Sequence, residues 1–69
     1  MTDALKTEPN ILRPDEVYAR LVGLHEGLSD EESHRASAAL VLLLANHIGD
    51  EAVIFAAIAA ARRQLRPGT

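Results

Sequence analysis

The chain has 69 residues, no cysteine and a formal net charge of −3, which excludes disulfide cross-links, cysteine-ligated metal sites and thiol redox chemistry. Hydrophobic residues make up 48% of the sequence, but only Tyr18 and Phe55 are aromatic, so aliphatic side chains have to supply any core. A chain of this size buries only about 60% of the surface that its unfolded form exposes, so a core of its own is marginal and self-association is favoured.

The fold class follows from the residue types. Alanine and leucine are strong helix formers and are abundant, whereas glycine and proline fall at a few separated points, unlike the closely spaced turns of an all-β chain. We expect helices over residues 14–26, 30–48 and 51–65, in one domain over residues 14–66. Residues 1–13 show no regular spacing of hydrophobic residues, which predicts an extended N-terminal arm. Residues 67–69 are expected to form a tail. The sequence therefore predicts an all-α, small three-helix bundle that is completed by oligomerisation.

The first predicted helix begins at Pro14, because the first turn of a helix tolerates the missing N–H group. Asp15 and Glu16 then place negative charge at the positive end of the helix dipole. Gly27 offers a left-handed cap that ends this helix. The apolar residues are spaced four, three and four apart and form one stripe: Val17, Leu21, Leu24 and Leu28.

The second and third predicted helices have clear start signals. Ser29 and Glu32 match the capping box, in which each side chain accepts a hydrogen bond from the backbone N–H of the other residue. Gly49 ends the second helix, and Asp50 caps the third after a very short connection. The main apolar stripe of the third helix consists of Ile54, Ile58, Ala61 and Leu65.

Apolar side chains exceed what one small core needs. Residues 40–44 are five consecutive aliphatic residues, so they point in every direction around the second helix. This surplus has two explanations: an interface with another protein, or a central helix buried on all sides by its neighbours and the arm. We predict the interface, so that a charged residue at Leu42 or Phe55 blocks assembly and leaves the helices intact. The predicted interaction residues are Leu40, Val41, Leu42, Leu44, Phe55 and Ala59.

Four residues at the second turn are candidates for recognition: Asn46, His47, Gly49 and Asp50. A histidine near a carboxylate can act as a base or supply two metal ligands. A metal site needs at least one more ligand, and no residue at a suitable spacing supplies it within one subunit. The simpler explanation is that Asn46 and His47 satisfy backbone groups at the helix end, while Asp50 is a cap. We predict no catalytic residue, no metal site and no cofactor.

Charge and hydropathy exclude other classes of function. Residues 1–35 hold eight acids and four bases, while residues 36–69 hold two acids and three bases. Only Arg62, Arg63 and Arg66 approach a basic patch, and they suit a helix C-terminus as well as an anion, so we expect no nucleic-acid partner. The longest uncharged stretch, residues 36–46, is shorter than the roughly 20 residues that span a bilayer, and no secretory signal is present. We therefore expect a cytoplasmic protein without a membrane partner.

Several blocks of the sequence resemble one family of short bacterial proteins. They are residues 8–11, 15–18, 25–29 and, most specifically, residues 42–50, which read LLLANHIGD. Together they resemble the domain of unknown function 2783 family, over roughly residues 8–60. The resemblance implies no activity. It associates the chain with flavin-dependent oxidoreductases of aromatic-compound breakdown, and so implies an accessory subunit in which Asn46, His47, Gly49 and Asp50 are recognition positions.

The leading hypothesis is a small helical protein–protein interaction module, which is a homodimer or an accessory subunit of a larger enzyme. The alternative is a small-molecule or metal-binding protein that uses Asn46, His47 and Asp50 and loses its ligand on His47→Ala substitution. A helix-turn-helix DNA-binding protein is a third possibility, and the acidic balance of the chain argues against it.

Overall fold

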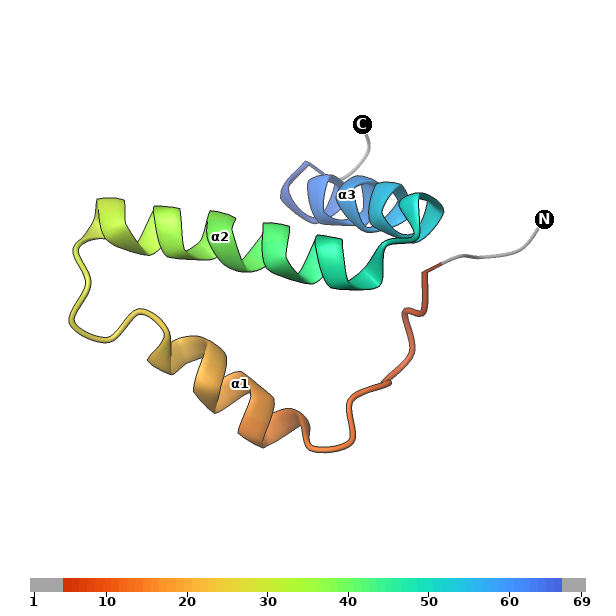
Figure 1. The fold of residues 1–69 in the computed structure, drawn as a ribbon. Helices are drawn as coiled ribbons and strands as arrows, with labels where there is room; N and C mark the ends of the chain where they lie inside the picture. The colour runs from red at the N-terminus through yellow and green to blue at the C-terminus, as the bar shows by residue number, and fades with distance from the viewer. Residues whose placement is uncertain (1–4, 67–69) are drawn as a thin grey trace.

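The computed structural model describes residues 5–66. The predicted tail at residues 67–69 and the first four residues of the predicted arm lie outside the described residues. The described chain contains three helices and no strand: α1 (Pro14–Gly23), α2 (Asp30–Ile48) and α3 (Glu51–Leu65) (Figure 1). The prediction of a small three-helix, all-α fold is confirmed. Residues 5–13 contain no helix and lead into α1.

α1 ends earlier than the sequence indicates. It begins at Pro14, and an ion pair joins Arg20 Nε to Glu16 Oε2 at 2.6 Å, one helical turn apart. The helix ends at Gly23, three residues before the predicted end at residue 26. Beyond this point the N–H groups donate to carbonyls three residues back, His25 to Val22 at 3.2 Å and Glu26 to Gly23 at 3.1 Å. The chain thus tightens into 3₁₀-type turns before it leaves the helix.

The role predicted for Gly27 is therefore wrong, although its conformation is the expected one. The residue that caps α1 is Leu24, which has right-handed helical angles. Gly27 has a φ of 78° and lies three residues further on, where the chain turns toward α2. The left-handed conformation that glycine adopts readily ends the tight turns rather than the helix itself.

The start and end signals of α2 are confirmed. Ser29 Oγ accepts a hydrogen bond from the N–H of Glu32 at 3.1 Å, and Glu32 Oε1 accepts one from the N–H of Ser29 at 3.0 Å. Both halves of the capping box are thus formed. At the other end Gly49 has a φ of 71°, and its N–H donates to the carbonyl of Ala45 at 2.9 Å.

Only two residues connect α2 to α3, because Asp50 serves as the N-cap of α3 directly. Its Oδ1 accepts from the N–H groups of Ala52 at 3.0 Å and Val53 at 3.4 Å. This short connection folds α3 back beside the last turns of α2 (Figure 1).

The three helices pack loosely. α2 contacts α3, whereas α1 contacts neither of them along the described chain. The radius of gyration is 13.9 Å, compared with about 11 Å for a compact domain of this length. No residue between 5 and 66 is buried. The explanation in which α2 is buried on all sides by its neighbours is therefore wrong for a single chain.

Candidate functional site

An apolar groove of about 330 Å³ lies between the second half of α2 and α3. We call it the α2–α3 groove. Its lining contains no charged and no polar side chain, and it includes one residue from the N-terminal segment. The lining residues are Leu5, Val41, Leu44, Ala45, Ile48, Val53, Ile54, Ala57, Ile58 and Ala61.

Helical periodicity explains why these residues share one groove. On α2 the lining positions 41, 44, 45 and 48 are spaced three, one and three apart, which places them on one side of the helix. On α3 the positions 53, 54, 57, 58 and 61 repeat in the same way. Because Asp50 caps α3 directly after Gly49, only two residues separate the end of α2 from the start of α3. The apolar side of α2 and the apolar side of α3 therefore meet at an angle that this turn sets.

The groove is open to solvent. Val41 is 62% exposed, Leu44 is 52% exposed and Ile58 is 60% exposed. Side chains of this kind usually form the core of a protein, and full burial of one contributes about 1.5–3 kcal/mol. A groove lined by several exposed aliphatic residues is a surface that another apolar surface can cover favourably.

The predicted interaction residues lie on different sides of the two helices. Val41 and Leu44 line the groove, and Leu40 is half-buried, as are residues 33 and 36 earlier in α2. Leu42 and Phe55 are exposed by 70% and 62% but do not line the groove. Ala59 lies with the arginines of α3 instead. The chain thus carries exposed apolar residues on more than one face, and Val41 and Leu44 are the ones that line the α2–α3 groove.

Sequence reasoning missed the contribution of Ile48 and Ile58 to this groove, although Ile58 was placed in the main stripe of its helix. In α3 the regular spacing of apolar residues indicated which side of the helix would be covered. In α2 no single face stands out, because residues 40–44 are apolar all round. Only the position of α3 decides which of these leucines line a groove.

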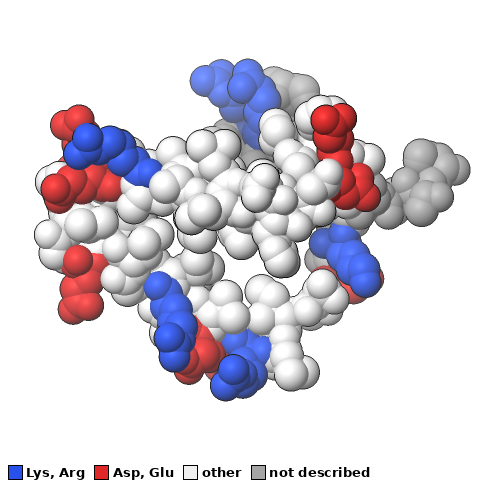
Figure 2. Space-filling model, viewed as in Figure 1, with Lys and Arg blue, Asp and Glu red and all other residues white. Residues whose placement is uncertain are grey.

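The charged side chains lie mainly toward the ends and outer edges of the face seen in Figure 2, and residues of all other types, polar as well as apolar, occupy its middle. The lining of the α2–α3 groove contains no charged residue.

The recognition candidates lie at the end of α2 and in the turn that leads into α3. The Asp50 carboxylate accepts from two backbone N–H groups of α3, as a cap does. The side chains of Asn46 and His47 make no hydrogen bond within the described chain, so the expectation that they satisfy backbone groups is wrong. Gly49 provides the left-handed turn. Between residues 5 and 66, no group of three or more histidine and acidic side chains is arranged to hold a metal ion.

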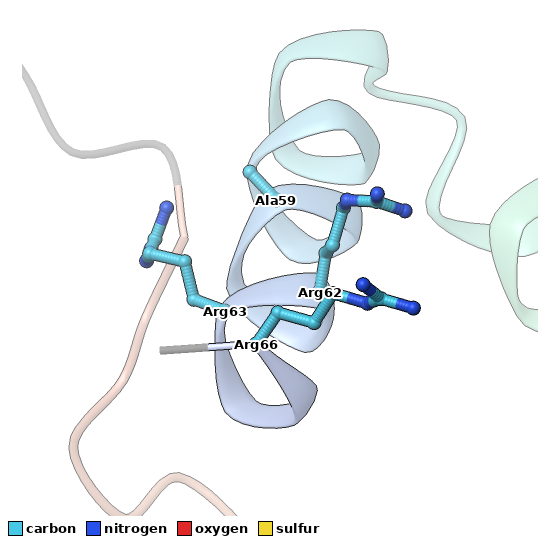
Figure 3. Close-up of a pocket in the computed structure, with 4 residues that line it drawn as sticks. All are labelled: Ala59, Arg62, Arg63 and Arg66. Carbon is cyan, nitrogen blue, oxygen red and sulfur yellow. The ribbon is translucent and has the colours of Figure 1, made fainter. Parts of the chain in front are cut away.

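A second hollow, of about 310 Å³, lies at the end of α3 beside Ala59, Arg62, Arg63 and Arg66. The side chains of Arg62 and Arg66 extend to one side of the helix, and Arg63 extends to the other (Figure 3). The three guanidinium groups therefore do not converge on one point, as a bound phosphate would require. They lie at the negative end of the helix dipole, which they stabilise.

One comparison identifies the family. A family model described as protein of unknown function DUF2783 matches residues 5–63. The chain belongs to the DUF2783 family. The match covers α1, α2 and α3 as far as residue 63, and it includes all ten residues that line the α2–α3 groove. The groove is therefore part of the region that defines the family. No curated protein and no solved structure matches the chain.

None of the helices in the described chain is both long enough and apolar enough to cross a membrane.

Proposed function

We propose that this DUF2783 protein is a cytoplasmic, helical protein–protein interaction module that binds another protein through the apolar side of α2 and α3. The observation that carries the proposal is the α2–α3 groove: ten apolar residues line it, and four of its large side chains, Val41, Leu44, Ile48 and Ile58, remain exposed. The partner is a second copy of the chain or a larger enzyme to which this chain is an accessory subunit.

The accessible surface of the chain supports the proposal. It measures 6409 Å², whereas a compact monomer of this mass exposes about 4,200 Å². Exposed apolar side chains contribute to the difference, because Leu42, Leu43 and Leu44 of α2 are 70%, 69% and 52% exposed. Contact with another protein is the ordinary way in which such a surface is removed from water.

The geometry of the polar groups gives no comparable support to an enzyme or a metal-binding protein. The carboxylate of Asp50 is engaged with backbone N–H groups, and the arginines of α3 do not converge (Figure 3). A binding surface therefore explains more of the described residues than a chemical site does.

The proposal is tested by native mass spectrometry of the tagged protein, purified gently from its own host. We expect the wild-type chain at a mass above its own 7.4 kDa, as a homo-oligomer or with a larger protein. By the association that the family resemblance implies, a flavoprotein is the first larger partner to look for.

Two variants locate the surface. Leu44→Asp places a charge in the groove, and the assembled species should disappear because a buried, unpaired charge is costly. Leu12→Asp is the matched control: Leu12 is 95% exposed and lies outside the helices and the groove, so assembly should persist. Circular dichroism checks that both variants keep their helices. A wild-type chain that occurs only as a free monomer in its host contradicts the proposed function.

A further inference from the structure

We propose, as a deeper form of the proposed function and resting on it, that the α2–α3 groove is occupied by the same face of a second copy of this chain. The two copies are related by a two-fold axis, and α3 of one copy runs antiparallel to α3 of the other. The interface is thus self-complementary, and each groove is completed by the partner copy.

The exposure of the groove residues supports a second copy. Val41, Leu44, Ile48 and Ile58 line the groove and are 62%, 52%, 50% and 60% exposed. The same apolar face of a second copy removes these side chains from water without leaving a polar group unpaired.

The lining of the groove favours a second copy over a different protein. Interfaces between different, separable proteins are about as polar as ordinary surface, while homodimer interfaces are more apolar and resemble a protein core. All ten lining residues are alanine, valine, leucine or isoleucine. No hydrogen-bonding or charged side chain in the lining is present to select a particular foreign partner.

The charges at the two ends of α3 favour the antiparallel arrangement. Glu51 begins the helix and Arg62 lies near its end. They are 11 residues apart, which is about three turns, so both lie on the same side of α3, next to the groove-lining face. When two such helices run antiparallel, Glu51 of each copy comes beside Arg62 of the other. In a parallel arrangement Glu51 of one copy and Arg62 of the other would lie at opposite ends of the interface, so the two could not pair.

The chain's own α1 is badly placed to cover the groove. It is joined to the start of α2 through residues 24–29, and within the described chain it contacts neither α2 nor α3. The groove begins at Val41, in the second half of α2, and α1 leaves it uncovered. Leu5 already lines the groove, yet the groove residues of α2 stay exposed.

Analytical ultracentrifugation of the purified full chain tests the inference across a range of concentrations. We expect a dimer for the wild type. Leu44→Asp and Ile58→Asp should each raise the dimer dissociation constant at least about hundredfold, because both place a charge inside the apolar interface. The matched control is Leu43→Asp, which is also on α2 and 69% exposed but does not line the groove; it should remain dimeric. Circular dichroism at high concentration shows whether each variant is still helical.

Charge exchange tests the orientation of the two copies. Glu51→Arg and Arg62→Glu should each weaken the dimer about tenfold, and the double variant should recover most of the loss. Because the recovery requires the two positions to face each other, a purely local effect on α3 would not produce it.

Each unfavourable result has a distinct meaning. A wild-type chain that sediments as a monomer overturns the second copy as the occupant, while the proposed function stands if the host complex still contains a larger protein. A dimer that tolerates both groove substitutions, or that Leu43→Asp disrupts equally, overturns the groove as the contact. A double charge variant as weak as the single variants overturns the antiparallel arrangement.

Discussion

At the scale of single residues, the helix ends of this chain are built from side chains close to them in the sequence. The hydrogen bonds between Ser29 and Glu32, and those from Ala52 and Val53 to Asp50, span only two or three residues. Such local contacts form without a core. They therefore specify where α2 and α3 begin, even though no described residue is buried.

The first prediction concerns the capping box. Ser29→Ala should lower the free energy of unfolding by about 1 kcal/mol, because the N–H of Glu32 loses its acceptor. The matched control is Ser37→Ala in the interior of α2, where alanine is the better helix former, so that stability should be unchanged or slightly higher. Thermal and urea unfolding followed by circular dichroism measures both variants. Equal effects of the two substitutions would contradict a capping role.

The second prediction compares two glycines. Gly49→Ala should destabilise the fold by about 1–2 kcal/mol, because its φ of 71° is unfavourable for any residue with a Cβ. Gly23→Ala should stabilise it by about 0.5–1 kcal/mol, because Gly23 is helical and an added Cβ meets nothing within 4 Å. The same unfolding experiment measures both, and the two effects should be opposite in sign. If Gly49→Ala were neutral, the left-handed end of α2 would not be needed.

At the scale of elements, the three helices differ in how they are supported. α2 has 19 residues, two good caps and contact with α3. α1 has ten residues and no side-chain cap, and within the described chain it contacts neither other helix. Isolated helices shorter than about 12–15 residues are marginal in water, so α1 depends on packing that a single chain does not provide.

The third prediction follows from this difference. In hydrogen exchange, the amides of α1 should lose protection before those of the second half of α2 and of α3. Under conditions that favour assembly, protection should rise most at residues 41–48 and 53–61, which hold the groove residues of α2 and α3. Mass spectrometry of peptic fragments at low and high protein concentration measures both effects. Uniform protection at every concentration would contradict a groove that is open in the single chain.

At the scale of the whole molecule, the chain is extended for its mass, with principal extents of 44 × 30 × 24 Å. In this shape many of the apolar side chains of α2 and α3 stay exposed in a single chain. Because apolar burial is the main favourable term in folding, the stability of the fold depends on a partner that buries them. Binding and folding are then linked, since a partner that binds only the folded chain stabilises it.

The fourth prediction is that thermal stability depends on concentration. If the second copy completes the fold, the unfolding midpoint should rise with protein concentration, and each tenfold increase should favour the folded dimer by about 1.4 kcal/mol. Differential scanning calorimetry over two decades of concentration measures the midpoint. The Leu44→Asp variant should show a lower midpoint that does not change with concentration. A constant midpoint for the wild type would show that one chain folds without its copy.

The sequence by itself determined the features that depend on neighbours a few residues away. Helical class, the capping box at Ser29, the left-handed Gly49 and the cap at Asp50 all follow from local hydrogen bonding and backbone preference. The end of α1 was missed, because the change from helical to tighter hydrogen bonds after Gly23 depends on small backbone differences that residue types do not specify.

Only the tertiary structure decided which apolar residues form a surface. The consecutive leucines of α2 predict an excess of apolar area, but their arrangement around the helix selects no face. The two-residue connection at Gly49 and Asp50 places α3 beside Val41 and Leu44, while Leu42 and Phe55 remain on other sides. The physical reason is that the angle at which α3 leaves the turn decides which side of α2 it lies against. That angle is a property of the folded backbone, and the pattern of residue types does not specify it.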